Sequence, residues 1–115
     1  MHKIVTVALI FVFCLVACNR QPKPEPEHIQ VIARKYAFEP AEIHVKRGQE
    51  VILEISTTDV QHGFFVRELG IDEPLQLGKP AMVSFRSDKV GEYRVECSIL
   101  CGPGHDRMKG KIIVE

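Results

Sequence analysis

The sequence lacks tryptophan, an excess of charge of either sign, and any apolar run long enough to cross a membrane comfortably. Lys plus Arg and Asp plus Glu each total 15, so the formal net charge is zero at pH 7. A balanced charge gives no electrostatic indication of nucleic acid or of a strongly acidic substrate as a partner. No internal repeat is visible, and no window of about eleven residues keeps a helical period. The 115 residues have room for one compact domain.

The first residues have the pattern of an export signal. Lys3 precedes an apolar run, Ile4 to Ala17, which reaches only about 20 Å as a helix against the roughly 30 Å of a hydrocarbon core. A basic start, a short apolar region and small residues at its end are typical of secretory signals. The run ends in Leu-Val-Ala-Cys18, which resembles the lipobox of bacterial lipoproteins. We therefore expect residues 1–17 to be a lipoprotein signal peptide and Cys18 to be lipidated, with an uncleaved short anchor as the alternative.

A proline-rich segment follows the predicted signal. Pro22, Pro24 and Pro26 alternate with charged residues, which favours an extended and semi-rigid spacer. We expect residues 18–27 to be a tether and residues 28–115 to be the folded domain. The protein would then be an exported, membrane-anchored lipoprotein facing the periplasm or the cell exterior.

Short segments rich in β-branched and aromatic residues predict an all-β domain. Gly and Pro residues separate these segments, as expected of turns. About seven strands without helices predict an antiparallel β-sandwich with loops at its ends. The predicted strands are residues 29–33, 43–46, 50–55, 63–66, 81–85, 92–96 and 111–114.

Soft metal ligands are concentrated between the last two predicted strands, at Cys97, Cys101, His105 and Met108. Thiolates and thioethers favour copper, particularly Cu(I), over magnesium or calcium. Zinc also binds Cys and His, but structural zinc rarely uses a thioether, so Met108 favours copper. A disulfide between the two cysteines is another interpretation, because exported proteins often form disulfides.

With His62 included, the pattern is H-x34-C-x3-C-G-x2-H-x2-M, which resembles the CuA domain of cytochrome c oxidase subunit II, in particular the short form of the ba3-type oxidases. The resemblance implies a cupredoxin-like Greek-key β-sandwich that binds two copper ions. It implies that Cys97 and Cys101 each bridge both ions. His62 and Met108 would complete one copper, while His105 and the backbone carbonyl of Ile99 would complete the other.

The function implied by the resemblance is electron transfer from a c-type cytochrome or similar donor to haem-copper oxidase subunit I. The chain would do no catalysis alone but could be the electron-accepting subunit of a cytochrome c oxidase. It departs from the family in two respects. Ile99 stands where many relatives have a Glu that also helps to bind magnesium, and the tryptophan that many relatives use where electrons arrive is absent, with Tyr36 or Phe38 in that region.

Two other copper functions remain open from the sequence. A mononuclear blue copper site needs one Cys, two His and a weak axial Met, a set that the chain has even without Cys97. A copper chaperone or sensor would use the same donors to hold Cu(I) and release it. Asp59, three residues before His62, is a candidate to orient that histidine by a hydrogen bond.

Overall fold

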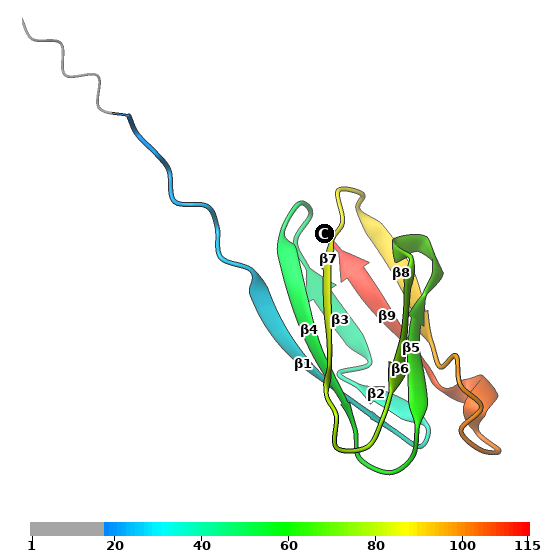
Figure 1. Cartoon of the computed structure of the whole chain (residues 1–115). Helices are drawn as coiled ribbons and strands as arrows, with labels where there is room; N and C mark the ends of the chain where they lie inside the picture. The colour runs from blue at the N-terminus through cyan, green and yellow to red at the C-terminus, as the bar shows by residue number, and fades with distance from the viewer. Residues whose placement is uncertain (1–17) are drawn as a thin grey trace, which may run out of the picture.

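The structure is a computed structural model that describes residues 18–115, so the predicted signal peptide lies outside the described residues. The described chain forms two β-sheets that face each other (Figure 1). One sheet has the strand order β2-β1-β4-β7 and the other has the order β3-β9-β8-β5-β6. The elements are β1 (Glu27–Arg34), β2 (Ala37–Glu39), β3 (Glu42–Val45), β4 (Glu50–Thr57), β5 (His62–Val66), η1 (Arg67–Leu69), β6 (Ile71–Leu75), β7 (Ala81–Arg86), β8 (Gly91–Glu96), η2 (His105–Arg107) and β9 (Lys109–Val114).

The predicted all-β sandwich is confirmed, but the described residues form nine strands instead of about seven. The additional strands are β2, which has three residues, and β6, whose sequence contains Asp, Glu and Pro. These residues are poor strand formers, and Pro is tolerated in β6 because that strand lies at a sheet edge.

The prediction of wholly antiparallel pairing is wrong at two places. β1 pairs with β4 in parallel, and β3 pairs with β9 in parallel. Between β1 and β4 the chain crosses through β2 in one sheet and β3 in the other, so β4 returns beside β1 in the same direction. Strand periodicity does not report the direction of a neighbour, so the sequence pattern could not reveal these pairs.

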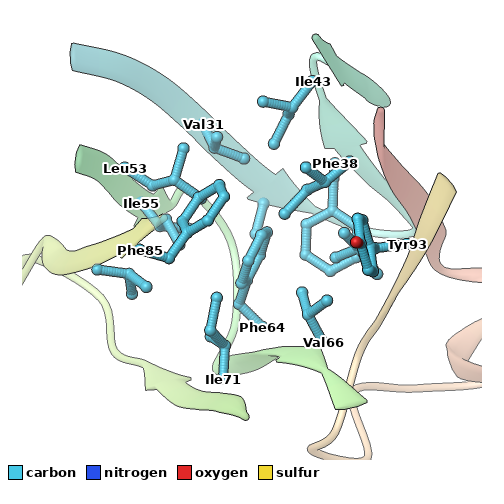
Figure 2. Close-up of a cluster of buried hydrophobic side chains, with 14 of the residues drawn as sticks. Val31, Phe38, Ile43, Leu53, Ile55, Phe64, Val66, Ile71, Phe85 and Tyr93 are labelled. Carbon is cyan, nitrogen blue, oxygen red and sulfur yellow. The ribbon is translucent and has the colours of Figure 1, made fainter. Parts of the chain in front are cut away.

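The core lies between the sheets, where alternate side chains of both sheets point inward (Figure 2). Phe38 from β2 and Phe64 from β5 meet edge to face, with ring centroids 5.6 Å apart and an interplanar angle of 86°. Such a pair contributes about 0.5–1.5 kcal/mol beyond the burial of its area. Because Phe64 lies two residues after His62 on the same inward face, this packing also fixes the strand that carries His62.

The predicted tether contains no strand or helix from Cys18 to Glu25, and these residues are exposed. It joins β1 at the end of the sandwich away from residues 97–108 (Figure 1). None of the helical turns in residues 18–115 has the length and apolar character needed to span a bilayer.

Candidate metal centre

Three of the predicted ligands lie at the ends of neighbouring strands. His62 begins β5, Cys97 follows the end of β8, and Met108 immediately precedes β9. In the sheet the order is β9-β8-β5, and β8 is antiparallel to both neighbours. The start of β9, the end of β8 and the start of β5 therefore lie side by side at one end of the sheet. All three residues also continue the inward-facing side of their strands, because side chains alternate with a period of two. His62 and Met108 are fully buried, and Cys97 is nearly so.

The two cysteine sulfurs lie at the centre of the predicted ligand set. Cys97 Sγ lies 3.7 Å from Cys101 Sγ and 3.8 Å from Nδ1 of His62. Cys101 Sγ lies 3.6 Å from Nδ1 of His105 and 3.9 Å from Sδ of Met108. His62, Cys97 and Cys101 offer ligand atoms that all lie within 4.8 Å of one another. The five predicted side chains therefore converge on one small volume.

The sixth predicted ligand, the main-chain carbonyl of Ile99, also faces this volume. The Cys97 thiol donates to that carbonyl oxygen over 3.1 Å. In residues 18–115 the structure contains no disulfide, and Cys97 and Cys101 are free thiols. The structure thus brings all six predicted positions together, while their role as metal ligands stays a prediction.

Residues 97–108, which we call the ligand loop, are closed by main-chain hydrogen bonds. Cys97 N donates to Met108 O over 3.2 Å and joins the two ends of the loop. The turn η2 carries His105, whose N–H donates to Gly102 O over 3.1 Å. Gly102 has φ of +138°, a conformation that favours glycine. These bonds direct His105 back toward the cysteine sulfurs.

Asp59 holds His62 from the side opposite the sulfurs, as the sequence hypothesis suggested. Oδ1 of Asp59 lies 2.8 Å from Nε2 of His62 and also accepts from Val60 N over 2.6 Å. Its Oδ2 accepts from Lys35 N over 2.6 Å. Partial burial acts to raise the pKa of Asp59, but the hydrogen bonds from Lys35, His62 and Val60 outweigh it and hold this pKa below 3.8. A charged Asp59 keeps the proton on Nε2 and leaves Nδ1 free for a metal.

The metal-free site holds a proton on the Cys101 sulfur at neutral pH. Burial raises the pKa of Cys101 to about 11, and the neighbouring Cys97 sulfur adds to this effect. A metal that binds here must displace that proton, so metal binding couples to pH. Two thiolates, one thioether and two imidazoles form a soft donor set, and copper suits it better than hard cations do.

The sequence pattern did not indicate two contacts of the ligand loop. The Ser98 hydroxyl donates to Oδ1 of Asp72 on β6 over 2.9 Å. Ser98 also packs over Gly63, next to His62, where an added Cβ would lie 3.0 Å from Ser98 N. Leu100 at the loop tip is 81% exposed. Such contacts join segments far apart in the chain, which residue spacing alone does not place side by side.

Known proteins are similar to this chain in sequence and in fold. A family model described as a cupredoxin-like domain matches residues 6–114. Cytochrome c oxidase subunit 2 of Thermus thermophilus is 34% identical over 95 residues, which cover 83% of this chain and 70% of that protein. A second subunit 2 sequence from Thermus thermophilus has the same identity, and the chain spans 56% of its length. Nitrous-oxide reductase of Stutzerimonas stutzeri is 34% identical over 83 residues, which are 13% of that enzyme.

Solved structures agree with these sequence relatives. The periplasmic domain of cytochrome oxidase subunit II from Bradyrhizobium japonicum superposes with a TM-score of 0.73 at 18% identity, covering 80% of this chain and 86% of that one. A chain of a heme-copper terminal oxidase dimer has a TM-score of 0.71 at 27% identity, covering 84% of this chain and 75% of that one. The chain therefore belongs to the cupredoxin-like family and, within it, to the cytochrome c oxidase subunit 2 family.

Proposed function

We propose that this protein is an electron carrier with a dinuclear CuA copper centre. Its predicted ligands are His62, Cys97, Cys101, His105, Met108 and the carbonyl of Ile99. The observation that carries the proposal is the pair of free thiols with sulfurs 3.7 Å apart, surrounded by two imidazoles and a thioether. Copper bound here supplies one-electron chemistry. The subunit 2 relatives support this function.

The arrangement of donors favours two ions over one. A mononuclear blue site gathers two His and one Cys around a single metal. Here each imidazole has its own sulfur, because His62 lies beside Cys97 and His105 lies beside Cys101. The two sulfurs lie only 3.7 Å apart, so each thiolate could serve metals held by either imidazole. Cys97 is thus a central member of the set and not a spare thiol.

The surrounding protein buries most of the site and keeps its donors in place. His62 and Met108 are fully shielded from solvent, and Asp59 fixes the ring of His62. Donors that hardly move on oxidation or reduction lower the reorganisation that electron transfer requires. The burial also argues against ready release of copper, which a chaperone or sensor would need.

Copper stoichiometry and spectroscopy of the reconstituted protein test this proposal. We expect two copper ions per chain, a purple colour, and an electron paramagnetic resonance signal in which one unpaired electron couples to two copper nuclei. Cys97→Ser should abolish the dinuclear signal. One copper per chain with a blue spectrum would overturn the proposal in favour of a mononuclear site. Rapid transfer of copper to an acceptor chelator, with slow electron exchange, would favour a delivery protein instead.

We infer that the electron donor is a c-type cytochrome or similar protein and that the acceptor is haem-copper oxidase subunit I. The subunit 2 relatives support this inference, although the chain spans only 20–22% of the length of several of them. Rapid mixing of the reduced copper protein with a haem-copper oxidase tests the acceptor. Electron transfer to the haems is expected, and its absence at saturating oxidase would contradict this assignment.

A related structure suggests how the thiols are kept reduced. It is described as a mixed disulfide intermediate between a thioredoxin-like protein and subunit II of cytochrome c oxidase, and it has a TM-score of 0.67 at 18% identity. We infer that a thioredoxin-like dithiol reduces any Cys97–Cys101 disulfide before copper binds, becoming a disulfide itself. If so, the oxidised protein should bind no copper until such a dithiol is added.

We further propose that Cys18 is lipidated and that residues 18–27 tether the domain, residues 28–115, outside the cytoplasm. The lipobox-like sequence and the exposed, proline-rich segment after it support this assignment. One acyl chain gives marginal membrane binding, so stable anchoring needs more than one. Mass spectrometry of the membrane-bound protein should find acyl chains on Cys18, and Cys18→Ser should release the protein into the soluble fraction. An unmodified, uncleaved N-terminus would contradict lipidation.

A further inference from the structure

We propose that Tyr36 is a positioning residue for the copper centre. Its ring braces the part of the ligand loop between Cys101 and His105 and thereby fixes where these two side chains lie. The inference rests on the proposed metal site but not on its being dinuclear, because Cys101 and His105 would bind copper in either form. Tyr36 lies outside the predicted ligand set, and the family resemblance places it, or Phe38, only in the region where electrons arrive.

The ring of Tyr36 lies against the main chain at two glycines of the ligand loop. A Cβ added at Gly104 would overlap the ring, with Cγ at 2.5 Å and Cε2 at 2.6 Å. A Cβ added at Gly102 would lie 2.5 Å from the Tyr36 hydroxyl oxygen. These distances are far shorter than side chains tolerate, so the half-buried ring occupies the space that the two glycines leave free.

Glycine is required at these two positions for different reasons. Gly102 has φ of +138°, so its backbone favours glycine whatever packs nearby. Gly104 has φ of −94° and ψ of 8°, near the bridge region that other residues also adopt. In this structure the steric requirement at position 104 is therefore the ring of Tyr36. This separates the packing of Tyr36 from backbone strain and makes it testable by substitution.

The turn that carries Tyr36 contacts the other half of the site as well. Lys35 N donates to Oδ2 of Asp59 over 2.6 Å, and Oδ1 of Asp59 holds Nε2 of His62. Two consecutive residues between β1 and β2 thus contact the support of His62 and the loop segment that carries Cys101 and His105. One short turn therefore helps to set the distance between the two halves of the ligand set.

Substitution of Tyr36 should loosen copper binding more than it loosens the fold. In Tyr36→Leu we expect copper to be lost to a chelator about tenfold faster or more, the scale seen when residues that support metal ligands are removed. The copper spectrum and the reduction potential should change with it. Tyr36→Phe keeps the ring and should behave like the wild type in all three measurements.

Tyr93→Leu is the matched control for loss of a buried tyrosine. Tyr93 lies in β8 with its hydroxyl donating to Lys89 O over 2.6 Å, in the loop between β7 and β8 at the far end of the sandwich. This variant should unfold more easily but should keep the wild-type copper spectrum, potential and rate of copper loss. Equal effects of Tyr36→Leu and Tyr93→Leu on copper loss, at equal loss of unfolding free energy, would overturn the proposal.

A size-reversal experiment tests the contact itself. Gly104→Ala should displace the Tyr36 ring and speed copper loss. Tyr36→Ala removes the ring with which the added Cβ at position 104 would clash. The double variant should therefore lose copper more slowly than the sum of the two single effects predicts. Strict additivity of the two effects on copper loss would overturn the proposal that the Tyr36 ring braces the ligand loop. Copper stoichiometry of the wild type separates the two proposals, since one copper per chain would refute the CuA assignment and leave the effect of Tyr36 on copper loss measurable.

Discussion

Replacing Asp59 with alanine should weaken copper binding and also destabilise the metal-free protein. Asp59 accepts three hydrogen bonds at 2.6–2.8 Å, from Lys35 N, Val60 N and Nε2 of His62. Each such bond contributes about 0.5–1.5 kcal/mol net, and more when one partner is charged. The Asp59 side chain is 32% exposed, so water can replace part of what the two amides lose, whereas His62 is fully buried. We therefore expect a loss of about 1–3 kcal/mol of unfolding free energy.

The effect on copper should exceed the effect on the fold. Without Asp59, Nε2 of His62 loses its acceptor, and the ring can rotate or change tautomer, so Nδ1 no longer faces Cys97. Loss of a residue that supports a metal ligand typically costs about 10–100-fold in metal affinity. Competition with a chelator of known Cu(I) affinity measures this change, and urea unfolding of the copper-free protein measures the stability change.

Asp59→Asn provides the control for shape. Its amide oxygen can still accept from His62 and Val60, but its NH2 group would face the N–H of Lys35, donor against donor. We expect an intermediate loss in both measurements. If Asp59→Ala bound copper with wild-type affinity, or if Asn cost as much as Ala, a hydrogen bond that orients His62 could not be the reason for the position of Asp59.

Three further predictions follow from the same geometry. The pKa of Cys101 is raised from 9.0 to about 11, so the folded metal-free protein keeps the Cys101 proton at a pH where the unfolded chain has released it. The contribution of the protonated Cys101 thiol to stability should therefore be complete below about pH 9 and should fall as pH rises toward 11. Alkylation of this thiol should accelerate over the same range. Loss of this dependence in the wild type, or its persistence in Cys101→Ala, would refute it. Gly110→Ala would place a Cβ 2.8 Å from the carbonyl oxygen of Ala41, so it should cost about 1–3 kcal/mol of unfolding free energy while copper stoichiometry stays the same. Met108→Leu conserves volume at a fully buried position, so the metal-free protein should lose less than about 1.5 kcal/mol of unfolding free energy. The Kd for Cu(I) should rise about tenfold, and the copper spectrum should shift. An unchanged Kd and spectrum would show that the thioether is not a ligand.

The convergence of the predicted ligands could be anticipated because their spacing carries chemical information. Cys97, Cys101, His105 and Met108 lie in one loop, and a soft donor set of this size is rarely accidental. His62 is distant in the sequence and was found through the family resemblance, not through periodicity. Asp59 could be proposed from its distance of three residues, since it lies in the short connection that leads to His62.

What the sequence could not reveal depends on which segments pack together. Tyr36 reaches the ligand loop because the turn between β1 and β2 lies at the same end of the sandwich, and nothing in its local sequence indicates this. The bond from Ser98 to Asp72 likewise joins the loop to an edge strand that contains Asp, Glu and Pro and was not predicted. The parallel pairing of β1 with β4 follows from a crossing between sheets, which depends on the whole topology.

The site combines a rigid half and a loop half, and the two have different physical requirements. His62, Cys97 and Met108 lie at the ends of three hydrogen-bonded strands, so the sheet itself fixes their spacing. Cys101 and His105 lie on the ligand loop, where only a few main-chain bonds and packing against other segments define the conformation. A site that must keep its geometry through oxidation and reduction therefore needs a support for the loop half that the sheet does not provide. The ring of Tyr36 and the Ser98–Asp72 bond lie where that support is required, one on each side of Cys101 along the chain.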